Sequence, residues 1–188
     1  MVRLSLVYRD KAFEEKNERN YYRWYRNYII LLVGVNTGSR ITTIIEQVPR
    51  DYAGGKFTVT ERKTGKRQQF VLNSQVYKPI KEYIETFNIG LNEFMFRPNL
   101  KSTEAITRQG ADKMIKKLAK EAGVEYCVAT HSLRKSYGRW YWDETKDLLR
   151  TQELLQHSSP METLRYICIE RDDTEAIRQA INNMPKFM

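Results

Sequence analysis

The sequence contains very little histidine and cysteine. Its 188 residues include two of each. The cysteines, Cys127 and Cys168, are too few for a disulfide framework. A reducing compartment is the simpler interpretation, so we expect the chain to be cytoplasmic. Both cysteines are then expected to be small buried hydrophobic residues.

A long apolar run is also absent. The longest such stretch is YIILLVGV at residues 28–35. A transmembrane helix is indicated only by a run of about 18 apolar residues, which is much longer. The first residues, MVRLSLVYRD, contain neither the apolar region nor the small-residue cleavage site of a signal peptide. We therefore expect no membrane partner, and the apolar stretch predicts a buried helix.

Several kinds of catalytic site are missing from the sequence. There is no glycine-rich phosphate loop for nucleotide hydrolysis, and the carboxylates are scattered rather than clustered for magnesium. A zinc site built from both cysteines and both histidines would need closer ligand pairs than this sequence offers. We predict no metal and no cofactor, so any phosphate chemistry would depend on side-chain cations.

What the sequence does contain is positive charge. A formal net charge of +9 favours a polyanionic partner, most often nucleic acid, although a basic surface can also serve solubility alone. The hydrophobic fraction of 41% and the charged fraction of 29% are typical of an ordinary soluble globular protein. A chain of 188 residues is long enough for one domain with a real core.

Apolar periodicity predicts a mainly helical chain. We expect helices over about 21–35, 73–87, 107–122, 130–142, 146–156, 159–169 and 173–184. Expected caps are Asn73 or Ser74, Thr107 and Gly123. The β-like runs KFTVT and QQFVL flank a Thr-Gly turn, which predicts a hairpin. This order indicates an α+β fold, mainly α, with a small antiparallel β-sheet rather than alternating βαβ units.

The first motif of interest is HSLR, which contains one of the two histidines. His131 and Arg134 are three residues apart, so both lie on one face of the predicted helix, in its first turn. Unsatisfied backbone N–H groups and the helix dipole favour an anion at that place. An imidazole and a guanidinium there suit a phosphate, although such a pair by itself also fits a solvated helix face.

The second motif, QHSSPMETLRY, contains the other histidine. His157 and Tyr166 are nine residues apart, across a turn. A free tyrosine has a pKa of about 10 and needs a proton acceptor and cationic neighbours to act as a nucleophile. By itself, Tyr166 is better explained as an amphipathic residue at the rim of the core.

Taken together, four blocks in this order resemble the catalytic domain of the tyrosine recombinases, the phage integrase family, over about residues 20–170. The segment NTGSR is similar to the one with the first catalytic arginine, which identifies Arg40. The segment ERKTGKRQQFVL is similar to the β-hairpin with the catalytic lysine. That resemblance favours Lys63, with Lys66 as the alternative.

The last two blocks carry the remaining site residues. HSLR matches the His-x-x-Arg block of the family and identifies His131 and Arg134. ELLQHSSPMETLRY matches the final block and identifies His157 and, nine residues later, the nucleophile Tyr166. Both histidines of the chain therefore fall on positions that the family requires.

The resemblance implies a mechanism of DNA breaking and rejoining. Tyr166 would attack a phosphorus of double-stranded DNA and displace the 5′-hydroxyl, which leaves a 3′-phosphotyrosyl link. The roles implied for the other residues are phosphate binding by Arg40 and Arg134, proton transfer by His131, a hydrogen bond to the phosphate from His157, and protonation of the leaving oxygen by Lys63. A second 5′-hydroxyl would then attack, so neither ATP nor a metal is required.

The chain departs from the family pattern in three places. Thr43 stands where many relatives have an acidic residue, and Gln156 replaces a glycine before the last histidine. Only about 20 residues precede the catalytic domain, so we expect either a fragment or a short recombinase, comparable to the fimbrial DNA invertases, without the N-terminal core-binding domain.

The resemblance also implies an organisation and an assembly. Residues 1–170 would form the catalytic domain. Residues 171–188 would form a helical tail that docks on a neighbouring protomer or packs on its own. A homo-tetramer is expected in the synaptic complex and a monomer in the free state. Two alternatives to recombination are relaxation of DNA, as by a type IB topoisomerase, and a DNA-binding fragment that is inactive without an N-terminal domain.

Overall fold

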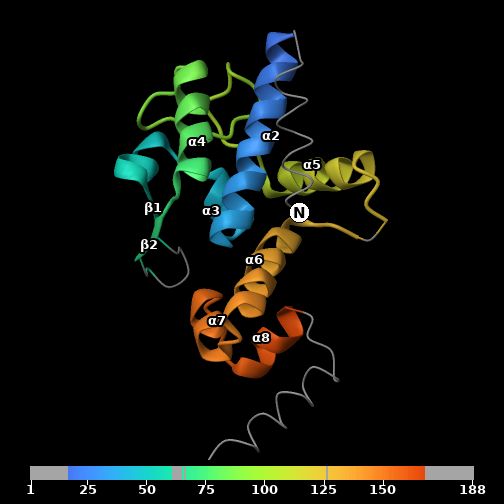
Figure 1. Ribbon diagram of the computed structural model, residues 1–188. Helices are drawn as coiled ribbons and strands as arrows, with labels where there is room; N and C mark the ends of the chain where they lie inside the picture. The colour runs from blue at the N-terminus through green and yellow to red at the C-terminus, as the bar shows by residue number, and fades with distance from the viewer. Residues whose placement is uncertain (1–16, 61–64, 66, 126, 168–188) are drawn as a thin grey trace, which may run out of the picture. The chain divides into compact units, whose positions relative to one another are not determined.

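The computed structural model describes residues 17–60, 65, 67–125 and 127–167. The chain divides into two compact units, Met1–Tyr137 and Gly138–Met188, and the boundary falls inside helix α6 (Figure 1). Lys63, Lys66, Cys168 and the helix predicted at 173–184 lie outside the described residues. Within those residues, no helix is both long enough and apolar enough to cross a bilayer.

The first unit contains most of the helices and the hairpin. Its elements are α2 (Glu18–Thr37), α3 (Ile41–Ile45), the 3₁₀ segment η1 (Pro49–Gly55), β1 (Lys56–Thr60), β2 (Arg67–Val71), α4 (Ser74–Thr86), α5 (Arg108–Glu121) and the start of α6 (Thr130–Thr145). The two strands are antiparallel, with Phe57 opposite Phe70. The predicted mainly α fold with a small antiparallel sheet is confirmed.

Short-range capping explains where several of these helices begin and end. The Asn73 side chain accepts a hydrogen bond from the Val76 amide at the start of α4. Thr107 does the same for Gly110 at the start of α5. Gly123, with φ of +67°, follows the last turn of α5. These three caps are the ones that the sequence predicts.

The core of the first unit is built around α2. Its middle turns, Ile29, Ile30, Leu31 and Val33, are almost completely buried. Tyrosines fill the space on either side, and their hydroxyls donate to backbone carbonyls. Tyr83 Oη donates to Met95 O at 2.7 Å and Tyr22 Oη to Arg97 O at 3.1 Å. Burial holds the pKa of Tyr83 well above its usual range, so this phenol stays a neutral donor.

The second unit is small and has a separate core. It contains the end of α6, α7 (Leu148–Leu154) and α8 (Pro160–Tyr166), drawn in orange and red in Figure 1. Trp142, Leu155 and Ile167 are buried together. Gly138 makes close packing possible, because a Cβ at this position would lie 2.7 Å from Leu155 Cδ1.

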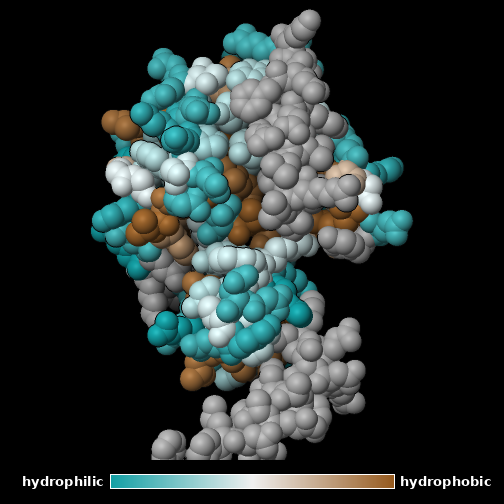
Figure 2. Space-filling model, in the orientation of Figure 1, coloured by the Kyte–Doolittle hydropathy of each residue, from teal (hydrophilic) through white to brown (hydrophobic). Residues whose placement is uncertain are grey.

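On the face shown in Figure 2, hydrophilic side chains cover much of the surface and hydrophobic ones form separate patches.

Candidate active site

Arg40 follows a tightly fixed turn at the end of α2. Gly38 ends the helix with φ of +60°. The Thr37 hydroxyl donates to Val33 O at 2.8 Å, and the Ser39 amide donates to Thr37 Oγ1 at 3.2 Å. The Arg40 carbonyl accepts from the amides at the start of α3. The backbone of Arg40 is therefore held from both sides, while its side chain is exposed.

Arg134 is tied directly to that turn. It lies on α6, is only 8% exposed, and its Nη1 donates to Gly38 O at 2.7 Å. Gly38 is two residues before Arg40 in the sequence. The structure therefore brings the segment of the first predicted arginine to the second, across 96 residues of chain.

Residues of α5 hold the start of α6. The Thr130 amide donates to Asp112 Oδ1 at 3.3 Å. Lys116 forms an ion pair with the same carboxylate at 2.6 Å. The hydrogen bond from Lys116 is the main reason why the pKa of Asp112 lies below its usual range. His131 is exposed in the first turn of α6, on the same face as Arg134.

Asp112 has no signal in the sequence. It lies 18 residues from the amide that it caps, and its spacing resembles that of any carboxylate on a helix face. Only the packing of α5 in the first unit shows that this side chain supports the segment with His131.

The close contact at Gly38 leads to a stability prediction. A Cβ here would lie 2.2 Å from Tyr137 Cδ1, and the positive φ adds strain. We expect Gly38→Ala to lower the free energy of unfolding by about 3 kcal/mol, from left-handed strain plus a clash. Gly54→Ala is a matched control, because Gly54 has φ of +65° with no atom within 4 Å. Urea unfolding should show a loss of only about 1 kcal/mol there; equal losses would contradict the clash.

In the second unit, His157 is fixed by bonds to Gln152. Its amide donates to Gln152 O at 3.1 Å, and Gln152 Nε2 donates to His157 O at 3.1 Å. The preceding residue, Gln156, has φ of +49°. Glycine adopts this left-handed conformation most easily, which explains why a glycine suits this position.

The rings of His157 and Tyr166 meet within this unit. Their centroids are 4.8 Å apart, with an edge-on angle of 73°. His157 Nδ1 lies 3.1 Å from Thr163 Oγ1. Both rings are partly buried. The nine-residue spacing of the sequence therefore corresponds to direct contact across the turn before α8.

The predicted site residues are thus described in two groups. Arg40, His131 and Arg134 belong to the first unit, and His157 and Tyr166 belong to the second. Among the described residues, no group of three or more His, Cys, Asp or Glu could hold a metal ion.

The expectation that Cys127 is buried is wrong, because it is exposed. It lies in the loop between α5 and α6, where its side chain is at the surface.

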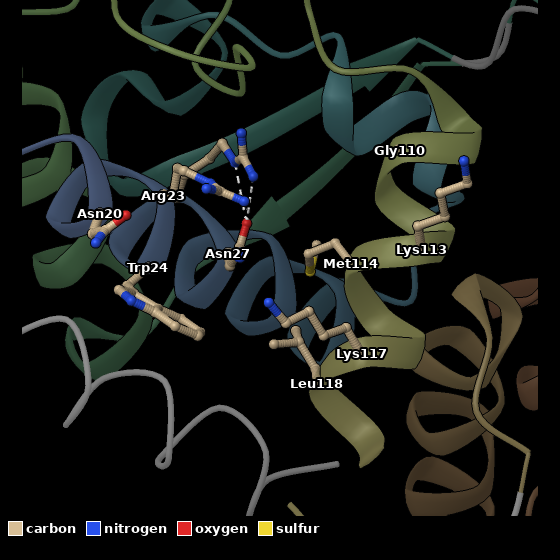
Figure 3. Close-up of a pocket in the computed structure, with 10 residues that line it drawn as sticks. Asn20, Arg23, Trp24, Asn27, Gly110, Lys113, Met114, Lys117 and Leu118 are labelled. Carbon is tan, nitrogen blue, oxygen red and sulfur yellow. Dashed lines mark hydrogen bonds between the residues drawn. The ribbon is translucent and has the colours of Figure 1, made fainter. Parts of the chain in front are cut away.

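A basic cavity of about 470 Å³ lies between α2 and α5 (Figure 3). Its lining residues are Asn20, Arg23, Trp24, Arg26, Asn27, Gly110, Lys113, Met114, Lys117 and Leu118. Two of these cations have structural bonds. Arg26 donates to Asn27 Oδ1 and to Arg97 O, and Lys117 pairs with Glu121. None of the predicted catalytic residues lines this cavity.

Comparison with known proteins gives consistent results. The model of the Phage integrase family matches residues 14–172. The chain is 32% identical over 152 residues to the probable integrase/recombinase YoeC of Bacillus subtilis (strain 168), covering 80% of this chain and 82% of the relative. It is 28% identical over 148 residues to tyrosine recombinase XerD of Listeria innocua, covering 75% and 49%.

Solved structures show the same fold. The crystal structure of the XerH site-specific recombinase bound to difH substrate matches with a TM-score of 0.69 at 23% identity, covering 92% of this chain and 49% of that one. The Tn1549 transposon integrase in complex with a circular intermediate DNA matches with a TM-score of 0.64 at 15% identity, covering 93% and 62%. The chain therefore spans about half the length of XerD and XerH.

Proposed function

Because the chain belongs to the phage integrase family, we propose that it is a site-specific DNA recombinase. It would cut and rejoin double-stranded DNA as a tyrosine-type strand transferase. The observation that carries this proposal is the bond from Arg134 to Gly38 O, 2.7 Å long. This bond joins Arg134 to the turn that precedes Arg40, which supports a phosphate site made by both arginines.

The nucleophile of the reaction is Tyr166. Its phenol oxygen attacks a DNA phosphorus while the bond from phosphorus to the 5′-oxygen breaks. The phenol proton passes to His131, and the leaving oxygen receives a proton from the hairpin lysine. The product is a 3′-phosphotyrosyl link. Because this link conserves the energy of the phosphodiester, a second 5′-hydroxyl can reverse the step and join a new strand.

The two arginines stabilise the charge that builds on the nonbridging oxygens. A guanidinium is planar, permanently charged and matched to phosphate geometry. The bond to Gly38 O anchors one nitrogen of the Arg134 guanidinium before DNA binds. Such preorganised donors are the largest source of catalysis in many enzymes, because no reorganisation is needed in the transition state.

The assembly follows from the need to exchange strands between two DNA sites. We propose a homo-tetramer in the synapse, a monomer in the free state, and action in the cytoplasm. Residues 1–170 serve as the catalytic domain and 171–188 as a tail that docks on a neighbouring protomer.

A plasmid assay tests the function. The substrate carries two copies of the DNA that flanks the chain's own coding sequence. We expect recombinant circles whose sizes report exchange between the two copies. Relaxed topoisomers without recombinants would contradict the proposal and support a topoisomerase. Binding without either product would support an inactive DNA-binding fragment.

The identity of the hairpin lysine can be tested with a modified leaving group. We expect Lys63→Ala to slow cleavage by about 10²–10⁴-fold, the usual contribution of a general acid. A substrate with sulfur in place of the bridging 5′-oxygen should restore the rate, because a thiol has a pKa of about 8.5 and its thiolate leaves without a proton.

Lys66→Ala is the control for this experiment. It removes the same charge three residues away and should cleave the ordinary substrate at the parent rate. If Lys66→Ala is the slow variant that sulfur rescues, the assignment of Lys63 is wrong.

A further inference from the structure

A buried threonine, Thr163, contacts His157, whose ring lies against the ring of the proposed nucleophile Tyr166. Thr163 is 0% exposed, and its Oγ1 lies 3.1 Å from His157 Nδ1. Thr163 and Tyr166 are three residues apart on α8, so their side chains lie on one face of the helix. The same short helix therefore carries the tyrosine and the hydroxyl that contacts the histidine.

The hydroxyl proton of Thr163 has a different partner. Thr163 Oγ1 donates to Ser159 O, one turn earlier, at 3.3 Å. A hydroxyl has only one proton to donate but can accept hydrogen bonds as well. With that proton given to Ser159 O, the hydrogen between Thr163 Oγ1 and His157 Nδ1 is the one that the imidazole donates, which corresponds to the Nδ1–H form of the ring.

A proton on Nδ1 determines how His157 can act. In the neutral ring, Nε2 is then an acceptor; in the imidazolium, both nitrogens donate. A donated bond from Nε2 to phosphate therefore requires the charged ring, and such charge-assisted bonds are stronger than neutral ones.

We propose that Thr163 is a positioning residue, which holds His157 with Nδ1 protonated and presents Nε2 to the scissile phosphate. This inference rests on the proposed recombinase function. It adds a residue that acts through His157 and not on the DNA. It also explains how the imidazole ring keeps its position beside the Tyr166 ring.

The test begins with the tautomer of His157, which can be read without DNA. Proton–nitrogen NMR correlations distinguish Nδ1–H from Nε2–H in a neutral imidazole. The chain has only two histidines, so the spectrum of His131→Gln identifies the His157 signals. In the parent chain without DNA, at a pH high enough for the ring to be neutral, we expect Nδ1–H; the charged ring is required only when phosphate is bound. Nε2–H in the parent chain would overturn the proposal, whatever the variants do.

Two variants then separate the hydroxyl from the shape of the side chain. Thr163→Val is nearly isosteric but lacks the hydroxyl, and we expect it to lose the Nδ1–H preference. It should also form the covalent adduct on a nicked duplex about 10-fold more slowly, the value of one hydrogen bond, with DNA affinity unchanged. Thr163→Ser keeps the hydroxyl and should restore both properties.

Thr151→Val is the matched control. Thr151 is also 0% exposed in the second unit, and its hydroxyl donates to Asp147 O one turn earlier at 2.6 Å. It should change neither the tautomer nor the rate. An unchanged tautomer or rate in Thr163→Val, or a Thr163→Ser that behaves like it, would overturn the proposal. Absence of any adduct in the parent chain would instead refute the recombinase function and leave the tautomer result standing.

Discussion

Tyr166→Phe is expected to form no covalent adduct with DNA. The parent chain should accumulate a 3′-phosphotyrosyl product on a nicked duplex from the DNA that flanks its coding sequence, because the nick releases a short strand and prevents religation. Phenylalanine keeps the ring, which packs against the Trp142, Leu155 and Ile167 cluster, so we expect the fold and DNA affinity to stay the same. A denaturing gel with labelled DNA measures the product.

Tyr141→Phe is the control for this experiment. Tyr141 is also a partly buried tyrosine of the second unit, so its substitution tests whether loss of any such hydroxyl reduces the adduct. We expect Tyr141→Phe to react at the parent rate. An adduct that persists in Tyr166→Phe would refute the assignment of the nucleophile.

Arg134→Lys is expected to slow cleavage by about 10²–10³-fold, as measured for the loss of one preorganised donor to a developing oxyanion. Lysine keeps the charge but not the planar fork, so one ammonium cannot both hold Gly38 O and bind the phosphate side-on. We expect a loss of about 1–2 kcal/mol in the free energy of unfolding as well, because the Gly38 carbonyl loses a buried partner. Single-turnover adduct formation and urea unfolding measure the two effects.

Arg139→Lys controls for the change of side chain on the same helix. Arg139 pairs with Asp143 at the surface at 2.9 Å, and such exposed pairs contribute little. Its substitution should leave cleavage and stability at the parent values. A cleavage rate within about threefold of the parent in Arg134→Lys would contradict a role in transition-state stabilisation.

The local part of the fold could be predicted from the sequence, because its causes are local. Asn73, Thr107 and Gly123 cap helices through bonds to residues within a few positions. Helix α2 begins earlier than predicted, at Glu18, because the Asn17 side chain accepts from the amides of Arg19 and Asn20. The polar residues before position 21 are helix-prone in sequence, but the apolar stripe that sets the predicted start begins only at Tyr21.

The connections within the site could not be predicted in this way. The bond from Arg134 to Gly38 joins residues 96 apart, and only the packing of α6 on α2 explains it. A Cβ on Gly34 would lie 2.7 Å from Leu133 Cδ1, which shows how closely these helices approach. Family resemblance identified the arginines but not the carbonyl that orients one of them. Thr163 had a usable signal, because it lies one helical turn before the proposed nucleophile.

The positive φ of Gln156 has a consequence for how such chains are recognised. At +49°, the backbone keeps the geometry that glycine would adopt freely, and a non-glycine residue accepts a cost of about 1–2 kcal/mol. The left-handed backbone at this position therefore does not require a glycine in this chain. A sequence pattern written with an obligatory glycine before the last histidine would miss this chain, whereas a search by backbone conformation would find it.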